Sequence, residues 1–193
     1  MVKKILIGTH NKGKFKEISC LLSKKYKKIS PLQLKIKSPK ETGKTFSSNS
    51  KLKAKFFSKY VNYPVISDDS GLCIKSLNNQ PGILSARLAK RHGGFFKAMK
   101  YILKKLKGKK NRSAYFICSL SYKIPYKKII TVEAKIRGKI SNEILGKNGF
   151  GYDPIFIPKS YKITFGEMIH SKKIYLDHRF LAFKKLKKKI RTL

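Results

Sequence analysis

Short apolar runs alternate with segments of helical spacing along the whole chain. The runs that predict strands are Val2 to Gly8, Pro64 to Ser67, Gly71 to Leu77, Ala114 to Tyr122, Ile129 to Ile136 and Pro154 to Pro158. Helical spacing occurs in Phe15 to Leu22, in Leu52, Phe56 and Tyr60, in Phe96 to Leu106, and in Phe183, Leu186 and Ile190. Because the two kinds of segment are interleaved, the pattern predicts an α/β fold.

The stretch from Ala114 to Arg137 is typical of a β-hairpin turning at Ile124-Pro125-Tyr126, so we expect a mixed central sheet with flanking helices. A length of 193 residues with 41% hydrophobic content fits one domain or two closely packed lobes, and we expect a single domain over residues 1–193. The Lys-rich segment from Lys184 to Arg191 keeps an apolar stripe, which favours a solvated helix face over an arm that binds nucleic acid.

Composition adds a formal net charge of +38, which raises the question of nucleic-acid binding. The basic residues are 41 Lys and only 6 Arg, spread over every segment. Base reading and bidentate phosphate contacts favour Arg, so we interpret the surplus as background composition and expect no specific nucleic-acid partner. Attraction of anionic substrates is the safer inference.

Neither a signal peptide nor a membrane span is indicated, because the apolar stretch near the start covers only Ile5 to Ile7. We therefore expect a cytoplasmic protein with no membrane partner. Cys20, Cys73 and Cys118 are odd in number and far apart, with no metal-ligand spacing, so we interpret them as reduced core residues.

The chain has only nine carboxylates, and four of them lie in three short polar clusters: Glu17, Glu41, Asp68 and Asp69. The first cluster contains Gly8-Thr9-His10-Asn11-Lys12-Gly13-Lys14 between a predicted strand and a predicted helix. The spacing of its glycines and Lys14 is that of a Walker A loop, but Phe15 replaces the hydroxyl residue that binds magnesium, which argues against a P-loop kinase or NTPase. The loop is either a polyphosphate site or an ordinary turn.

Asp68-Asp69-Ser70-Gly71-Leu72 follows the predicted strand Pro64 to Ser67, so we place both carboxylates at the exit of that strand. Neighbouring strand residues point to opposite faces, and one carboxylate can hold a divalent ion while the other positions the turn. The alternative is an ordinary polar surface turn.

Two further segments have both a functional and a structural interpretation. Gly146 to Pro154 is Gly-rich and carries two aromatics and a carboxylate; it can contact a base, or simply lead into a strand. Asp177-His178-Arg179 precedes the last predicted helix, with Asp177 as its expected N-cap.

Taken together, these clusters resemble the inosine triphosphate pyrophosphatase family, which hydrolyses non-canonical purine nucleoside triphosphates. The resemblance runs from Ile5 to Arg179. It rests on T-x-N-x-x-K-x-x-E from Thr9 to Glu17, E-T-G from Glu41 to Gly43, D-D-S-G-L from Asp68 to Leu72, P-G-I-x-S-A-R from Pro81 to Arg87, G-F-G-Y-D-P-I-F from Gly149 to Phe156, and Lys173 with His178-Arg179.

The resemblance implies two lobes around an active-site cleft, a homodimer, and magnesium-dependent hydrolysis of ITP, dITP and XTP to the monophosphate and pyrophosphate. It makes Asp69 the catalytic carboxylate and Glu41 with Asp69 the metal ligands. The substrate positions that it implies are Thr9, His10, Asn11, Lys12, Gly13, Lys14, Ser70, Phe150, Gly151, Tyr152, Asp153, Lys173, His178 and Arg179. Lys53 falls in the matching helix near the site.

Some positions depart from the usual pattern of the family. Asp177 stands where Ser commonly precedes His-Arg, and its charge would weaken nucleotide binding if it faced the phosphates. Ser48 replaces a frequent Glu, and Ser171-Lys172 stand where acids are frequent. The alternative function is a non-catalytic basic protein that binds nucleotides or nucleic acid, with steep salt dependence and no turnover.

Overall fold

The fold is taken from a computed structural model that describes residues 3–190, so Val2 and Arg191 of the predicted segments lie outside the described residues. The strands are β1 (Lys3–Ile7), β2 (Tyr26–Ile29), β3 (Val65–Ile74), β4 (Gln80–Pro81), β5 (Ser113–Lys123), β6 (Ile130–Ile140) and β7 (Phe156–Pro158). The α-helices are α1 (Lys12–Leu21), α2 (Phe46–Phe57), α3 (Ser85–Arg91), α4 (Phe95–Lys105), α5 (His170–Lys173) and α6 (His178–Lys189). Short 3₁₀ helices are η1 (Lys75–Leu77), η2 (Gly82–Leu84) and η3 (Asp153–Ile155).

The strands follow the order β2-β1-β3-β5-β6-β7, with β4 beside β3. β1 pairs in parallel with β2 and β3, whereas β4 is antiparallel to β3 and β7 is antiparallel to β6. The predicted mixed α/β sheet is therefore confirmed. The turn between β5 and β6 lies where the apolar pattern placed it, with Lys127 N–H donating to the Ile124 carbonyl.

The residues group into two compact units, each assembled from separate segments of the chain. Unit 1 comprises the described residues up to Asp69, Cys118–Ala134, and those from Arg179 onward; unit 2 comprises Ser70–Ile117 and Lys135–His178. The expectation of one domain over residues 1–193 stays a prediction.

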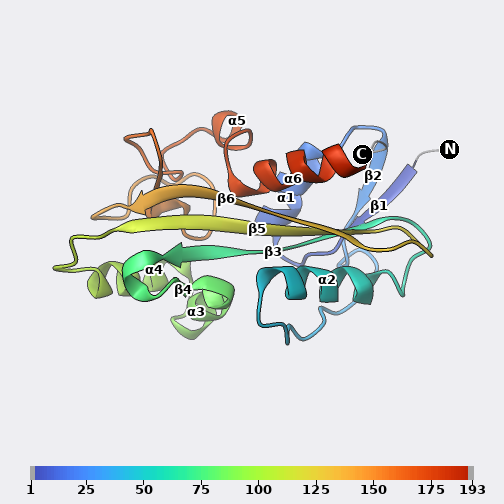
Figure 1. Ribbon diagram of the computed structural model, residues 1–193, viewed down its shortest axis with the longest axis horizontal. Helices are drawn as coiled ribbons and strands as arrows, with labels where there is room; N and C mark the ends of the chain where they lie inside the picture. The colour runs from blue at the N-terminus through green and yellow to red at the C-terminus, as the bar shows by residue number, and fades with distance from the viewer. Residues whose placement is uncertain (1–2, 191–193) are drawn as a thin grey trace. The chain divides into compact units, whose positions relative to one another are not determined.

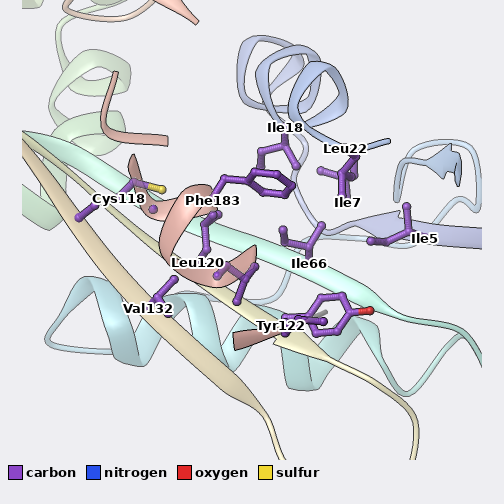
Figure 2. Packing of buried hydrophobic residues seen from close by; sticks show 14 of the residues in the cluster. Ile5, Ile7, Ile18, Leu22, Ile66, Cys118, Leu120, Tyr122, Val132 and Phe183 are labelled. Carbon is purple, nitrogen blue, oxygen red and sulfur yellow. The ribbon is translucent and has the colours of Figure 1, made fainter. Parts of the chain in front are cut away.

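Strand alternation divides unit 1 into two apolar layers. Ile5, Ile7 and Ile66 share a core cluster with buried residues of α1 and α6, among them Ile18 and Phe183 (Figure 2). The intervening strand residues instead pack with Phe57 of α2 on the opposite face, as Leu6 and Val65 do. Figure 1 accordingly shows α1 and α6 on one side of this part of the sheet and α2 on the other.

Unit 2 has an aromatic core of its own. The Phe116 ring of β5 packs 4.6 Å from the Phe156 ring of β7, and Phe156 packs 5.4 Å from Phe165, as measured between ring centroids. Arg112 fixes the start of β5, because its guanidinium donates to the main-chain carbonyls of Ile140 and Leu106 at 2.9 and 3.3 Å. These contacts hold together the strands from which the loop at 146–154 departs.

The cysteines are free, as expected, but only Cys73 and Cys118 are buried. Cys20 lies on the exposed face of α1, so its interpretation as a core residue was wrong. The prediction of a solvated helix for the Lys-rich tail is confirmed, since Phe183 and Leu186 are buried while the lysines between them are exposed.

Candidate active site

Asp68 and Asp69 lie in the middle of β3, whereas the sequence placed them at its exit. The apolar runs on either side of them are one continuous strand, Val65–Ile74, so the expected turn at Asp68-Asp69-Ser70-Gly71 was wrong. A buried strand accepts the two carboxylates because each finds cationic partners. The expectation that they point to opposite faces is confirmed: Asp68 contacts Lys14 of α1, and Asp69 contacts Asn49 of α2.

Asp68 is fully buried and faces the start of α1. Asn11 caps this helix, because its side-chain oxygen accepts a hydrogen bond from the Lys14 N–H at 3.0 Å. The cap places the Lys14 ammonium 3.0 Å from Asp68 Oδ2. Burial alone would raise the pKa of Asp68, but the charges of Lys14, Lys53 and Arg179 lower it from 3.8 to about 2. Asp68 is therefore a carboxylate at any ordinary pH.

A second buried ion pair lies on the same face of the sheet. Arg179 in the first turn of α6 donates from Nε to Glu17 Oε2 at 2.5 Å, and each side chain is no more than 4% exposed. This pair joins α1 to α6 across 162 residues of sequence. It gives Glu17, which ends the T-x-N-x-x-K-x-x-E motif, a structural reason to be acidic.

Asp69 lies on the other face, within a group of polar side chains from α2. Asn49 Nδ2 donates to Asp69 Oδ2 at 3.0 Å, and Asn49 Oδ1 accepts from the Gly43 N–H at 2.8 Å. The Lys53 ammonium lies 2.8 Å from Glu41 Oε1 and 3.9 Å from Asp69 Oδ1. Asn49 thus connects the E-T-G segment to Asp69.

Opposed effects set the protonation of this group. Burial raises the pKa of Asp69 and the nearby Glu41 charge adds to the rise, against the opposing charges of Lys53 and Lys14. Burial would lower the pKa of Lys53, but Asp68, Asp69 and Glu41 together raise it. The group therefore combines a firmly charged ammonium with a carboxylate of increased proton affinity.

The same carboxylates suit a hard divalent cation. Mg²⁺ usually takes one or two protein carboxylates and completes its shell with water and substrate phosphates. Glu41 and Asp69 both approach the Lys53 ammonium, which shows that this position favours a cation. Within residues 3–190, no cluster of three or more His, Cys, Asp or Glu side chains could hold a metal ion unaided.

In unit 2, the Gly-rich loop is fixed by Asp153. Gly149 has φ +73°, a left-handed conformation that turns the chain so that Phe150 N–H donates to Asp153 Oδ2 at 2.9 Å. Tyr152 points inward and donates its hydroxyl hydrogen to the Ser85 carbonyl at 2.9 Å. The loop is thus an ordered turn, with Asp153 and Tyr152 buried.

Lys173 is the buried cation of unit 2. Its Nζ lies 2.9 Å from Asp153 and 3.7 Å from Asp177, and 5.3 Å from the centre of the Phe150 ring. Asp177 immediately precedes α6, as the sequence predicted for an N-cap position, and its carboxylate is fully buried beside Lys173. Its negative charge is therefore balanced internally.

Each predicted site residue falls in one of the two units. Unit 1 contains the phosphate loop from Thr9 to Lys14, Glu41, Asp69 and Arg179; unit 2 contains Ser70, the loop from Phe150 to Asp153, Lys173 and His178. Lys12 is exposed at the start of α1, and Ser70 is half-buried in β3. The buried His178 ring stacks on Phe116 with centroids 4.8 Å apart.

The His10 side chain ties the phosphate loop to the segment after β2. Its Nε2–H donates to the Ile36 carbonyl at 3.0 Å, and its ring lies 6.2 Å from that of Phe57. This contact indicates a positioning role for His10 within unit 1.

Sequence reasoning missed Asn49 and left Lys53 out of the site. A signal was present: polar residues at positions 49, 50 and 53 share one face of a helix whose other inward residues are apolar. Ser48, which stands where the resemblance expects Glu, instead completes a capping box with Thr45 at the start of α2.

This arrangement defines a mixed α/β protein with paired buried acids and lysines beside a strand-to-helix loop, a combination suited to phosphate and metal chemistry. The chain belongs to the Ham1 family, whose model matches residues 5–189. The resemblance to inosine triphosphate pyrophosphatases is thereby confirmed at the level of the family.

Relatives with named activities are similar over almost the whole chain. A dITP/XTP pyrophosphatase of Bacillus subtilis is 40% identical over 193 residues, covering 97% of each chain. A dITP/XTP pyrophosphatase of Caulobacter vibrioides is 38% identical over 189 residues, again covering 97% of each chain. The structure of the Staphylococcus aureus Ham1 protein matches with a TM-score of 0.87 and 32% identity, covering 98% of this chain and 99% of that one. Among residues 3–190, no helix is both long and apolar enough to cross a membrane.

Proposed function

We propose that the protein hydrolyses the non-canonical purine nucleotides ITP, dITP and XTP to the monophosphate and pyrophosphate. Relatives nearly 40% identical over their whole length are named dITP/XTP pyrophosphatases. The observation that carries the proposal is the Asp69 group. A buried carboxylate of raised pKa, held by Asn49 and flanked by Lys53 and Glu41, suits proton transfer beside a phosphate.

In this proposal a water oxygen attacks the α-phosphorus and Asp69 accepts the proton that the water loses. The bond from the α-phosphorus to the α,β-bridging oxygen breaks, and pyrophosphate leaves with that oxygen. Lys53 and Lys14 neutralise charge that develops on the phosphate oxygens. Asn49 fixes the Asp69 carboxylate through Oδ2, which leaves Oδ1 directed toward Lys53.

Glu41 and Asp69 are the side chains that would hold Mg²⁺. When bound, the ion would neutralise phosphate charge and polarise the leaving group. A matched pair of variants, Glu41→Gln and Glu143→Gln, tests the assignment through magnesium binding alone. Only Glu41→Gln should weaken that binding, because Glu143 is exposed and belongs to neither group of the site.

We propose that Phe150 to Asp153, His178 and Arg179 select the base, as the family resemblance implies. The Phe150 ring can stack on a purine, while His178, Arg179 or main-chain N–H groups of the loop donate to the 6-oxo group of hypoxanthine or xanthine. Adenine has an amino donor at that position, so two donors would meet and a buried group would lose its partner. For guanine, which shares the 6-oxo group, we propose exclusion of the 2-amino group by shape; similar turnover of GTP and ITP would refute this.

We further propose that the protein is cytoplasmic and that it forms a homodimer, the latter as the family resemblance implies. Light scattering coupled to gel filtration tests the dimer directly. A monomer at working concentrations that is fully active would contradict this part of the proposal without affecting the chemistry.

The decisive experiment measures pyrophosphate release from ITP, XTP, GTP, ATP and dTTP with magnesium. Asp69→Asn should reduce turnover of ITP by about 10²- to 10⁴-fold, the usual contribution of a general acid or base. Glu133→Gln is the control, because Glu133 is an exposed carboxylate on β6. No turnover of any nucleotide by folded protein would instead favour the non-catalytic basic binder.

A further inference from the structure

A concave, strongly basic surface lies in unit 2, and none of the residues of the proposed hydrolytic site belongs to it. The hollow has a volume of about 550 Å³ and is bordered by β5, β6, β7 and η1. We call it the basic pocket and define it by its five cationic side chains: Lys75, Lys135, Arg137, Lys139 and Lys159. None of the described residues that line it is an acid.

The strand pattern concentrates these charges. Lys135, Arg137 and Lys139 alternate along β6 with buried or half-buried residues, so their side chains emerge on the same exposed face. Lys159 follows β7, which pairs with β6 through Gly138 and Pro158. At Gly138 the strands approach so closely that a Cβ atom would lie 2.2 Å from the Ile157 carbonyl oxygen. The pairing therefore holds the cations of two strands around one hollow.

This concentration differs from the general lysine surplus of the chain. Like charges around a concavity repel one another, and the low-dielectric walls focus their field into the hollow. Lysines scattered over a convex surface do not have their electric field concentrated in this way. The pocket is therefore a place where a multiply charged anion relieves repulsion as well as gaining contacts.

Tyr115 on β5 indicates which kind of anion fits. The ammonium groups of Lys75 and Lys135 lie 5.5 and 5.0 Å from the centre of its ring. Both lysines already cover the aromatic ring, so the pocket favours phosphate groups over stacked bases. Four of the five cations are Lys, which acts on phosphate as a point charge and does not read base edges.

We propose that the basic pocket binds a chain of linked phosphates, either an inorganic oligophosphate or the triphosphate tail of a nucleotide, at a site separate from the Asp69 group. The volume of about 550 Å³ has room for a ligand of this size. The proposal does not depend on the proposed hydrolysis, because binding can be measured without magnesium and without turnover.

The test is an NMR titration of the full chain with inorganic triphosphate in the presence of a chelator. The backbone amides of Gly138 and Ser160 should shift and saturate. In Lys135→Gln/Arg137→Gln the dissociation constant read from these amides should rise about tenfold, the combined effect of two lost exposed ion pairs. The matched control is Lys187→Gln/Lys188→Gln on the exposed side of α6. This variant removes the same charge and should change the dissociation constant less than about twofold.

The remaining titrations identify the source of the phosphates and the results that overturn the proposal. ATP binding as tightly as inorganic triphosphate would identify the nucleotide tail as sufficient, and much weaker ATP binding would assign the pocket to inorganic chains. The proposal is overturned if these amides do not saturate, or if both double variants weaken binding equally. It also fails if only a single-stranded oligonucleotide without terminal phosphates shifts them. Shifts confined to Thr9–Lys14 would support the hydrolytic site while rejecting the basic pocket.

Discussion

Replacing Asp68 by Asn should change the pH dependence of stability by an amount that follows from the structure. The carboxylate is fully buried, 3.0 Å from the Lys14 ammonium, and its pKa falls from 3.8 to about 2 despite the opposing effect of burial. Each tenfold change in proton affinity corresponds to about 1.4 kcal/mol, so the charged form contributes about 2–3 kcal/mol to folding at neutral pH.

The sign follows from the direction of the shift. Because the folded state binds the proton more weakly than the unfolded state, this contribution is fully present above pH 3.8 and is lost as the pH falls toward about 2. Asp68→Asn lacks it at every pH. The difference in unfolding free energy between wild type and Asp68→Asn should therefore shrink by about 2 kcal/mol between about pH 5 and about pH 2.

Urea denaturation at a series of pH values, followed by circular dichroism, measures both proteins. Glu133→Gln removes an exposed carboxylate and shows how much pH dependence any acid contributes. Contributions from the other acids cancel in the difference between wild type and Asp68→Asn. A difference that stays constant over this pH range would refute the reasoning, because the Lys14 pair would then confer no preference for the charged form.

Four further substitutions test other contacts, each by urea denaturation. Glu17→Gln should lower the free energy of unfolding by about 3–5 kcal/mol, because the buried Arg179 charge loses its carboxylate partner. A decrease no larger than that of the control Glu143→Gln, at an exposed position, would contradict this. Lys173→Met should lower the free energy of unfolding by a similar amount, because it leaves the Asp153 and Asp177 carboxylates buried together. Asp177→Ser should lower it clearly less, because Lys173 keeps its 2.9 Å contact to Asp153. Equal losses for the two variants would refute this ranking. Gly8→Ala should lower the free energy of unfolding by about 1–3 kcal/mol, because the new Cβ would lie 2.2 Å from Ser67 Oγ and 2.6 Å from the Phe57 ring. An unchanged stability would show that these side chains move aside without cost.

Apolar periodicity predicted the long elements because their burial is regular. β5 and β6 extend only a few residues beyond the apolar runs that predicted them, and α1, α4 and α6 begin and end near the predicted segments. The pattern missed the short helices α3 and α5 and the short strands β2 and β4, and it extended the strand to Leu77 where η1 replaces it after Ile74. The four residues of β2 include two lysines, so its place beside β1 depends on main-chain pairing that apolar periodicity cannot reveal.

The principal error concerned β3. Two adjacent acids followed by Ser and Gly favour a turn by local propensity, but tertiary contacts override it. The two buried carboxylates are stabilised by a cation or a hydrogen-bond donor from helices on the two faces of the sheet, and those helices lie far away in sequence. Lys14 is 54 positions before Asp68, and Asn49 is 20 before Asp69. The motif thus singled out two acids that are buried beside cationic side chains, while giving the wrong local structure.

The scarcity of acids in this chain has a physical explanation in the same contacts. Five of the nine carboxylates are buried: Glu17, Asp68, Asp69, Asp153 and Asp177. Each lies beside a buried or half-buried cation. Losing Glu17, the partner of the buried Arg179, would cost about 3–5 kcal/mol, whereas losing Asp177 would cost less because Lys173 keeps its contact to Asp153. Exchanging an exposed acid for Lys costs at most about 1 kcal/mol by comparison. A chain that accumulates lysine can therefore lose exposed acids at lower cost than a buried partner such as Glu17, which leaves a large share of the remaining acids in buried contacts.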